Sequence, residues 1–230
     1  MWRAAGMMLP LGVILAGGRA TRMGGGDKGL LVLDENSGTT ILDHVIDRLA
    51  GQVTALALSA NGDPARFARF GLPVLADPLP GHVGPLAGVL AGLDWAAGRG
   101  ARAIVTVAAD TPFFPRDLVA RLCAAAAGQA HPLVLAATAR ARGEHTRSMS
   151  GAGLVRHPTF GLWPVALRDD LRAALAGGLR KVVLWTEPHG GREALFDAAQ
   201  DPFFNVNTPE DLRAARARAR QAGGRPARPG

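Results

Sequence analysis

The sequence predicts an α/β protein with a mostly parallel sheet and helices on both faces of that sheet. Short apolar runs rich in β-branched residues alternate with helical stripes of apolar residues, a pattern typical of strand–helix–strand units. Several runs end directly in glycine or aspartate, as expected where a parallel sheet binds ligands. A chain of 230 residues, 48% of them apolar, can fill one such three-layer, Rossmann-like domain. We expect that domain at 1–222, followed by a disordered basic tail at 223–230.

The first half of the chain divides into strands and helices of ordinary length. The run at 102–109 is the most strongly β-branched and is therefore the expected central strand. Thr39 or Thr40 is the expected cap of the first helix. The expected strands are 11–16, 53–59, 72–76 and 102–109. The expected helices are 39–51, one that starts after a turn at 61–64, one that follows 81–88 and reaches about Ala97, and one opened by Pro115.

The second half is less regular. Residues 139–156 are polar, basic and rich in glycine and serine, so we expect a mobile loop there. Residues 203–212 are expected to form a strand end that runs into the last helix, with Thr208 as its cap and Pro209 at its first position. The other expected strands are 133–137, 159–165 and 181–185, and the other expected helix is 168–176.

A glycine-rich cationic loop follows the first strand, in the stretch LGVILAGGRATRMGGGDKGLL at 11–31. Glycines such as Gly17 and Gly18 let the backbone approach a ligand closely, so that successive N–H groups converge on anionic oxygens. Arg22 and Lys28 add positive charge. The loop does not fit the dinucleotide fingerprint G-x-G-x-x-G, because Gly17 and Gly18 are adjacent. It does not fit the P-loop, which ends in Gly-Lys-Ser/Thr, because Gly29 follows Lys28. The loop therefore predicts a polyphosphate site of another kind.

Three widely separated residues directly follow predicted parallel strands: Gly17, Asp77 and Asp110. Because the carboxyl ends of such strands meet at one edge of the sheet, we expect all three to line one cleft. Mg²⁺ prefers one or two carboxylates together with phosphate oxygens. Asp110, at the end of the expected central strand, is the predicted metal ligand, and Lys28 is predicted to neutralise a triphosphate.

Composition narrows the class of protein further. Six arginines and no acid lie beyond position 212, so the net charge of +7 leaves only +1 for the rest of the chain. This distribution, with no tyrosine, argues against nucleic acid as a partner. No apolar run is long enough to span a bilayer, and no signal peptide is recognised. The single Cys123, expected to be buried and inert, fits a reducing cytoplasm.

The motifs together resemble a known family. The loop resembles L-A-G-G-x-x-x-R-M-G-x-x-K of sugar-nucleotide and cofactor nucleotidyltransferases, with one more residue between Gly24 and Lys28. Its full spelling most resembles the molybdenum cofactor guanylyltransferases. Further matches are A-D-T-P at 109–112, G-P-L-A-G at 84–88, H-P-T-F-G-L-W at 157–163 and N-V-N-T-P-E-D at 205–211. The resemblance runs from Val13 to about Leu212. The sequence departs from the family at 34–40, at 139–156 and in the arginine tail.

The resemblance implies transfer of GMP from GTP to the phosphate of molybdenum-loaded molybdopterin, with Mg²⁺ as cofactor. Transient contact with cofactor-biosynthesis proteins and recipient molybdoenzymes is a further expectation. The implied catalytic residues are Lys28, Arg22 and Asp110. The implied nucleotide-binding residues are Leu15, Ala16, Gly17, Gly18, Lys28, Ser59, Asn61, Asp77, Gly84 and Asp110. The implied acceptor-binding residues are His157, Asn205 and Asn207.

Several alternatives stay open at this point. Ser59 stands where the family often has Asn, so either Ser59 or Asn61 takes the nucleotide contact. Asp77 accepts hydrogen bonds from guanine or from ribose. The chain could instead be a cytidylyltransferase for the same cofactor, although those relatives more often read A-A-G-x-S in the first loop. A non-catalytic module that binds nucleotide or nucleic acid is the alternative from another class.

Overall fold

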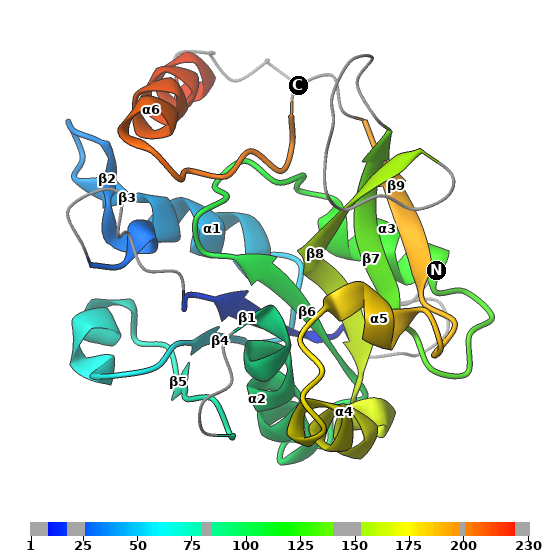
Figure 1. Cartoon of the computed structure of the whole chain (residues 1–230). Coiled ribbons are helices and arrows are strands. Elements are labelled where there is room, and N and C mark those ends of the chain that lie inside the picture. The colour runs from blue at the N-terminus through cyan, green and yellow to red at the C-terminus, as the bar shows by residue number, and fades with distance from the viewer. Residues whose placement is uncertain (1–8, 18–25, 80–83, 140–152, 198–200, 224–230) are drawn as a thin grey trace.

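The computed structural model describes residues 9–17, 26–79, 84–139, 153–197 and 201–223 (Figure 1). Its centre is a seven-stranded sheet in the order β5-β4-β1-β6-β8-β7-β9, and a separate two-stranded ribbon pairs β2 with β3. The strands are β1 Leu11–Leu15, β2 Val32–Asp34, β3 Thr39–Thr40, β4 Leu56–Ser59, β5 Val74–Leu75, β6 Ala103–Ala108, β7 Val134–Ala139, β8 Leu154–Pro164 and β9 Arg192–Phe196.

The sheet is mostly parallel, which confirms the predicted fold class. Strands β5, β4, β1 and β6 run parallel to one another, and β9 runs parallel to β7. Only β8 runs antiparallel to both of its neighbours, β6 and β7. The β-branched run predicted to be central is β6, which has a buried side chain at every position.

Helices pack against both faces of this sheet (Figure 1). In β1 the side chain of Ile14 joins the apolar cluster that contains Leu42 of α1 and Leu122 of α3. The neighbouring Val13 points to the opposite face and joins the cluster that contains Leu90 of α2 and Leu171 of α4. The helices are α1 Ile41–Ala50, α2 Pro85–Ala97, α3 Leu118–Ala125, α4 Arg168–Ala176, α5 Val182–Thr186 and α6 Pro209–Gly223, with 3-10 turns η3 Lys28–Leu30, η4 Pro64–Phe70 and η5 Val165–Leu167.

The first half follows the predicted order with small shifts at the ends of elements. Thr40, not Thr39, caps α1, in a reciprocal capping box with Asp43. Asp63 caps the 3-10 helix after the predicted turn, where its side chain accepts a hydrogen bond from the Ala65 amide at 2.9 Å. The helix expected to open at Pro115 begins at Leu118, because a turn in which the Leu118 amide donates to the Pro115 carbonyl comes first.

In the second half, the structure corrects three predictions and shows one strand that was not predicted. Residues 181–185 are not a strand: α5 forms there, with Val182 and Trp185 buried at helical spacing. Strand β9 was not predicted, because its exposed Leu195 weakens the alternation of apolar and polar residues. The ends of the predicted loop 139–156 belong to β7 and β8. Residues 204–207 form no strand, although Thr208 does cap α6 by accepting from the Asp211 amide at 3.1 Å.

Most of the basic C-terminal segment is a packed helix rather than a free tail. Helix α6 lies beside the β2–β3 ribbon (Figure 1), where the Arg216 Nε donates to the Val32 carbonyl at 3.1 Å. The Arg218 guanidinium stands 4.4 Å from the centre of the Phe113 ring. The helix includes Gly223, where the disordered tail was expected to begin, and 224–230 lie outside the described residues.

The structure also bears on the expectations for Cys123 and for membrane-spanning segments. Cys123 is buried, and burial raises the pKa of its thiol to about 12, so the thiol is inert as expected. Within the described part of the chain, every helix is too short or too polar to cross a membrane.

Candidate active site

Strand register brings the predicted nucleotide residues together. Leu15 of β1 lies opposite Ser59 of β4 on one side and Ala108 of β6 on the other. The pairing continues one residue further, because the Ala16 amide donates to the Ser59 carbonyl at 2.8 Å and the Ala109 amide to the Leu15 carbonyl at 3.1 Å. The chain therefore leaves three adjacent parallel strands at one level of the sheet, the place where ligands bind in such folds.

A cavity of about 410 Å³ opens at this level. Its size falls within the range of small-molecule sites. As expected, Gly17, Asp77 and Asp110 all line it, from segments far apart in the sequence. The other predicted nucleotide-binding residues along its wall are Leu15, Ala16, Lys28, Ser59, Asn61 and Gly84.

Lys28 and Asp110 meet at one end of the cavity. The Lys28 Nζ lies 3.1 Å from the Asp110 Oδ2, and the side chains of Lys28 and Asp110 are 16% and 21% exposed. Lys28 also donates to the Asn207 Oδ1. Thr111 donates to the Asn205 Oδ1 and, at 3.3 Å, to the Asp110 Oδ1. The predicted catalytic pair and the two predicted acceptor amides thus form one polar cluster.

The loop before α6 is tied to this cluster through its backbone. The Val206 amide donates to the Asp110 carbonyl at 2.9 Å, which seats this loop against the end of β6. Asp211 accepts from the backbone amides of Asn207 and Thr208, both at 2.9 Å. Burial raises the pKa of Asp211, but these hydrogen bonds and the charge of Lys28 lower it by more, so its carboxylate stays ionised.

The opposite end of the cavity carries the Asn61–Asp77 pair. The Asn61 Nδ2 donates to the Asp77 Oδ2 at 2.7 Å, and the Asp77 amide donates to the Asn61 Oδ1 at 2.9 Å. Ser59 is buried directly under α2: a Cβ added to Gly88 would stand only 2.6 Å from the Ser59 Oγ. The glycine at 88 therefore permits the close approach of α2 to β4.

The oxygens around Asp110 fit a magnesium ion. The Asp110 carboxylate and the amide oxygens of Asn205 and Asn207 are hard donors that already share Lys28 and Thr111 as partners. No group of three or more His, Cys, Asp or Glu gathers anywhere in the described residues. A metal at this position would therefore depend on one carboxylate, neighbouring amides and the phosphates of a ligand.

His157 lies apart from the cavity wall. Its Nε2 lies 3.0 Å from the Thr138 Oγ1, and its ring stacks on Phe203 with centres 4.2 Å apart. Burial lowers the pKa of His157 to about 4, so the imidazole is neutral at pH 7. Thr159, two residues further along β8, does line the cavity. Gly18 and Arg22, also predicted for the site, lie outside the described residues.

Some residues of this site were missed from sequence. Asp27 lies in the glycine-rich loop but was given no role there, and Arg66 and Phe67 carry no motif that distinguishes them from surface residues. Only the fold brings Phe67 to the cavity and Arg66 to Asp27. Asp211 could have been found from the sequence, because Thr208-x-x-Asp211 has the spacing of a capping box. That spacing predicts a fixed turn at Asn207.

Comparison with known proteins identifies the family. The family model described as the MobA-like NTP transferase domain matches residues 12–190. The chain belongs to this family. As a MobA-like NTP transferase it is a nucleotidyltransferase.

Curated relatives narrow the branch. A molybdenum cofactor guanylyltransferase of Mesorhizobium japonicum is 51% identical over 207 residues, covering 87% of this chain and 91% of its own. One of Rhodopseudomonas palustris is 53% identical over 208 residues, covering 88% and 89%. These relatives place the MobA-like chain among the molybdenum cofactor guanylyltransferases, which confirms the resemblance found in the sequence.

Solved structures share the fold at low identity. The Archaeoglobus fulgidus molybdopterin-guanine dinucleotide biosynthesis protein A has a TM-score of 0.64 and 20% identity, with 92% of this chain and 99% of the other covered. A CMP-2-keto-3-deoxy-manno-octonic acid synthetase in complex with CTP has a TM-score of 0.67 and 18% identity, with 93% and 99% covered. Both confirm the Rossmann-like nucleotidyltransferase architecture.

Proposed function

We propose that this chain transfers GMP from GTP to the terminal phosphate of molybdenum-loaded molybdopterin and releases pyrophosphate. The observation that carries the proposal is the contact between Lys28 and Asp110 at the end of a cavity of nucleotide size. The names of the curated relatives supply the substrates. The single buried Cys123 favours the reducing cytoplasm as the place of reaction.

GTP would lie along the cavity from Asn61 to Asp110. Asp77, held by two hydrogen bonds to Asn61, presents a carboxylate that can accept from guanine or ribose. The amides that follow β1, together with Gly84 at the start of α2, would lie against the nucleotide. The triphosphate would then reach Lys28, where its negative charge replaces Asp110 as the partner of the ammonium group.

Charge neutralisation and positioning would supply most of the catalysis. An oxygen of the pterin phosphate attacks the α-phosphorus of GTP, the bond from that phosphorus to the β-phosphate oxygen breaks, and pyrophosphate leaves with the electron pair. Lys28 would stabilise the negative charge that develops on the phosphoryl oxygens. Arg22, in the same glycine-rich loop, is proposed to assist it.

The acceptor would bind beside Asn205 and Asn207, whose amides lie next to Asp110. Asp110 would hold Mg²⁺, which would supply positive charge to neutralise the phosphate groups. Because His157 is neutral and partly buried, we propose that it supports Phe203 and the acceptor segment without transferring a proton.

Labelling with each nucleotide tests this function. The protein is incubated with molybdopterin and either GTP or CTP labelled at the α-phosphate, with Mg²⁺ present. The proposal predicts that label from GTP, and not from CTP, enters the pterin product. Labelling from CTP alone would identify a cytidylyltransferase, and no labelling from either nucleotide would favour a non-catalytic binding module.

A further inference from the structure

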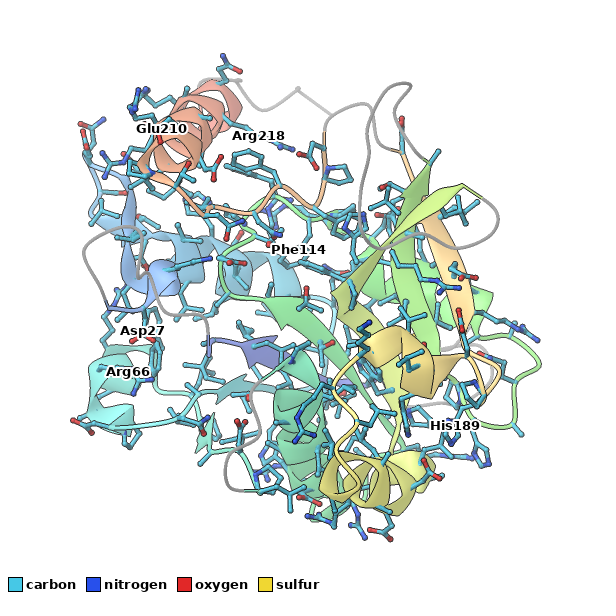
Figure 2. The ribbon with its side chains drawn as sticks, in the orientation of Figure 1. Asp27, Arg66, Phe114, His189, Glu210 and Arg218 are labelled. Atoms are coloured by element: carbon cyan, nitrogen blue, oxygen red, sulfur yellow. The ribbon has the colours of Figure 1, made fainter. Side chains whose placement is uncertain are left out.

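Arg66 connects the two ends of the cavity through its guanidinium group. The Arg66 Nε donates to the Asp27 Oδ2 at 2.6 Å, and one terminal nitrogen donates to the Asn61 carbonyl at 2.6 Å. The other terminal nitrogen donates to the Asp63 carbonyl. The guanidinium also stands 4.5 Å from the centre of the Phe67 ring. Figure 2 shows Arg66 beside Asp27 at the edge of the molecule.

The partners of Arg66 are parts of the site. Asp27 directly precedes Lys28, whose ammonium group meets Asp110. Asn61 holds Asp77 by two hydrogen bonds. Asp27 and Asn61 both line the cavity. A single planar side chain with fixed donors therefore sets the distance between the loop that carries Lys28 and the strand end that carries Asn61.

Asp27 gives this contact an electrostatic consequence. A carboxylate on the wall of a cavity that takes a triphosphate repels the ligand unless a cation neutralises it. Arg66 is that cation, and the two side chains are only 28% and 16% exposed, so water screens the pair incompletely. Loss of Arg66 would leave Asp27 as an unpaired negative charge one residue from Lys28.

We propose that Arg66 is a positioning residue for GTP, which fixes the Lys28 loop against Asn61 and neutralises Asp27 before the nucleotide binds. The proposal rests on the proposed function, since it assumes that GTP occupies this cavity. Arg66 does not line the cavity, and its polar partners are Asp27, Asn61 and Asp63 rather than Asp110, so its effect belongs to nucleotide binding and not to the chemical step.

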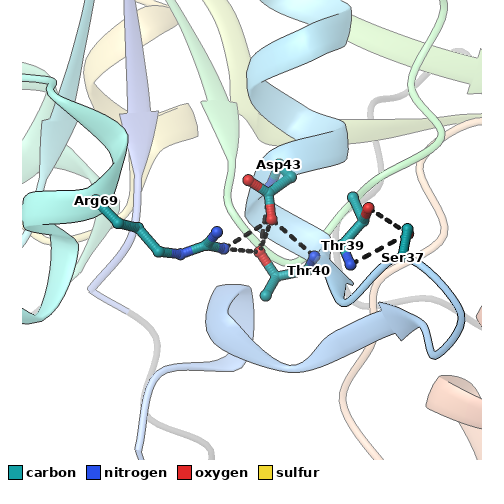
Figure 3. Close-up of polar contacts among 5 residues, drawn as sticks. All are labelled: Ser37, Thr39, Thr40, Asp43 and Arg69. Carbon is teal, nitrogen blue, oxygen red and sulfur yellow. Dashed lines mark hydrogen bonds and ion pairs between the residues drawn. The ribbon is translucent and has the colours of Figure 1, made fainter.

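Arg69 offers a matched control in the same 3-10 helix. Like Arg66, it pairs with an aspartate, Asp43, at 2.7 Å, and its guanidinium lies over a phenyl ring, that of Phe70, at 4.1 Å. Its contacts go to the capping box of α1, where it also donates to the Thr40 Oγ1 at 2.8 Å (Figure 3). Neither arginine lines the cavity, but Arg66 contacts two residues that do, Asp27 and Asn61. Removal of either arginine therefore costs the helix similar interactions, but only one of them is connected to the site.

The test compares steady-state kinetics of Arg66→Met and Arg69→Met in the full chain. Arg66→Met is expected to raise KM for GTP about tenfold and to leave kcat within about twofold, as for a lost binding interaction. Arg69→Met is expected to lower the melting temperature by about as much as Arg66→Met does. Unlike Arg66→Met, it should leave KM for GTP within about twofold of wild type. Arg66→Lys, which keeps the charge but loses the fork, is expected to fall between wild type and Arg66→Met.

A double variant tests whether Arg66 acts by neutralising the charge of Asp27. Asp27→Asn in the Arg66→Met background removes the unpaired charge and is expected to restore about threefold of the lost affinity for GTP. Equal KM values for Arg66→Met and Arg69→Met, or no recovery in the double variant, would overturn the proposal. These failures differ from failure of the proposed function, which would appear in the wild-type protein as no product from GTP.

Discussion

The two halves of the sheet contribute to the site in different ways. The half up to Asp110 consists of parallel strands in register, and it provides most of the cavity wall, including the residues that follow β1, β4, β5 and β6. The half beyond Asp110 contains the antiparallel strand β8. Among its described residues, only Thr159 lines the cavity, and the amides of Asn205 and Asn207 lie beside Asp110. Parallel strand ends thus hold the nucleotide side, and an irregular loop holds the acceptor side.

Of the variants considered, Lys28→Met should show the largest difference between its effect on GTP turnover and its effect on pterin binding. The ammonium group is the one described cation in contact with Asp110, so its loss should lower kcat/KM for GTP by about 10²–10³-fold, as for other groups that stabilise developing charge. Affinity for the pterin, measured in the absence of nucleotide, should change by less than about threefold. Steady-state kinetics measures kcat/KM for GTP, and a pterin fluorescence titration measures the affinity for the pterin. A variant that keeps more than a third of wild-type turnover would contradict the role of Lys28.

His157 gives the second half a pH dependence of stability. Its pKa is about 4 in the folded protein, against 6.5 for an unperturbed imidazole, because the ring is buried. The unfolded chain therefore binds a proton more readily as pH falls below about 6.5, and the folded state loses stability between pH 7 and pH 5. From this difference in pKa we expect a loss of about 2 kcal/mol in the free energy of unfolding at pH 5 relative to pH 7.

Urea unfolding of wild type and His157→Phe at the two pH values checks this. The phenyl ring preserves the stack on Phe203 but cannot titrate, so the variant should lack this part of the loss on acidification. An equal loss in both proteins would show that His157 is not the group responsible.

Asn205→Ala should produce the smallest of these effects and should act mainly on binding of the acceptor. The Asn205 amide contacts Thr111 and does not line the nucleotide cavity. Removal of one polar contact to the pterin should raise KM for the acceptor about tenfold and leave KM for GTP within about twofold. Asn36→Ala, in the exposed turn between β2 and β3, is a suitable control. A rise in KM for GTP equal to that for the pterin would remove the distinction between the halves.

The same contrast explains what could be predicted from the sequence. In the parallel half, each buried strand is a continuous apolar run, and the residue that follows it carries the chemistry, so Gly17, Asp77 and Asp110 could be assigned to one cleft. In the second half, Val182 and Trp185 suggest a strand by composition but pack as a short helix. Local pattern cannot distinguish these two outcomes when a segment is only five residues long.

Contacts between distant segments were the part that could not be predicted. Arg66 reaches Asp27 across 39 positions of sequence, and neither residue belongs to a motif of its own. The Lys28 contact with Asn207 spans 179 positions and depends on the path of the loop before α6. The family resemblance named the residues at both ends, but only the fold shows that one ammonium group touches both Asp110 and Asn207.

Asp110 is proposed to lie at the reacting end of a GTP site, and the single-turnover rate of GMP transfer by Asp110→Asn is the most direct test of this role. We expect a rate about 10³-fold below wild type, because the carboxylate proposed to hold Mg²⁺ is lost. GTP affinity measured without metal should stay within about threefold of wild type. An Asp110→Asn protein that transfers GMP at the wild-type rate would contradict this role of Asp110.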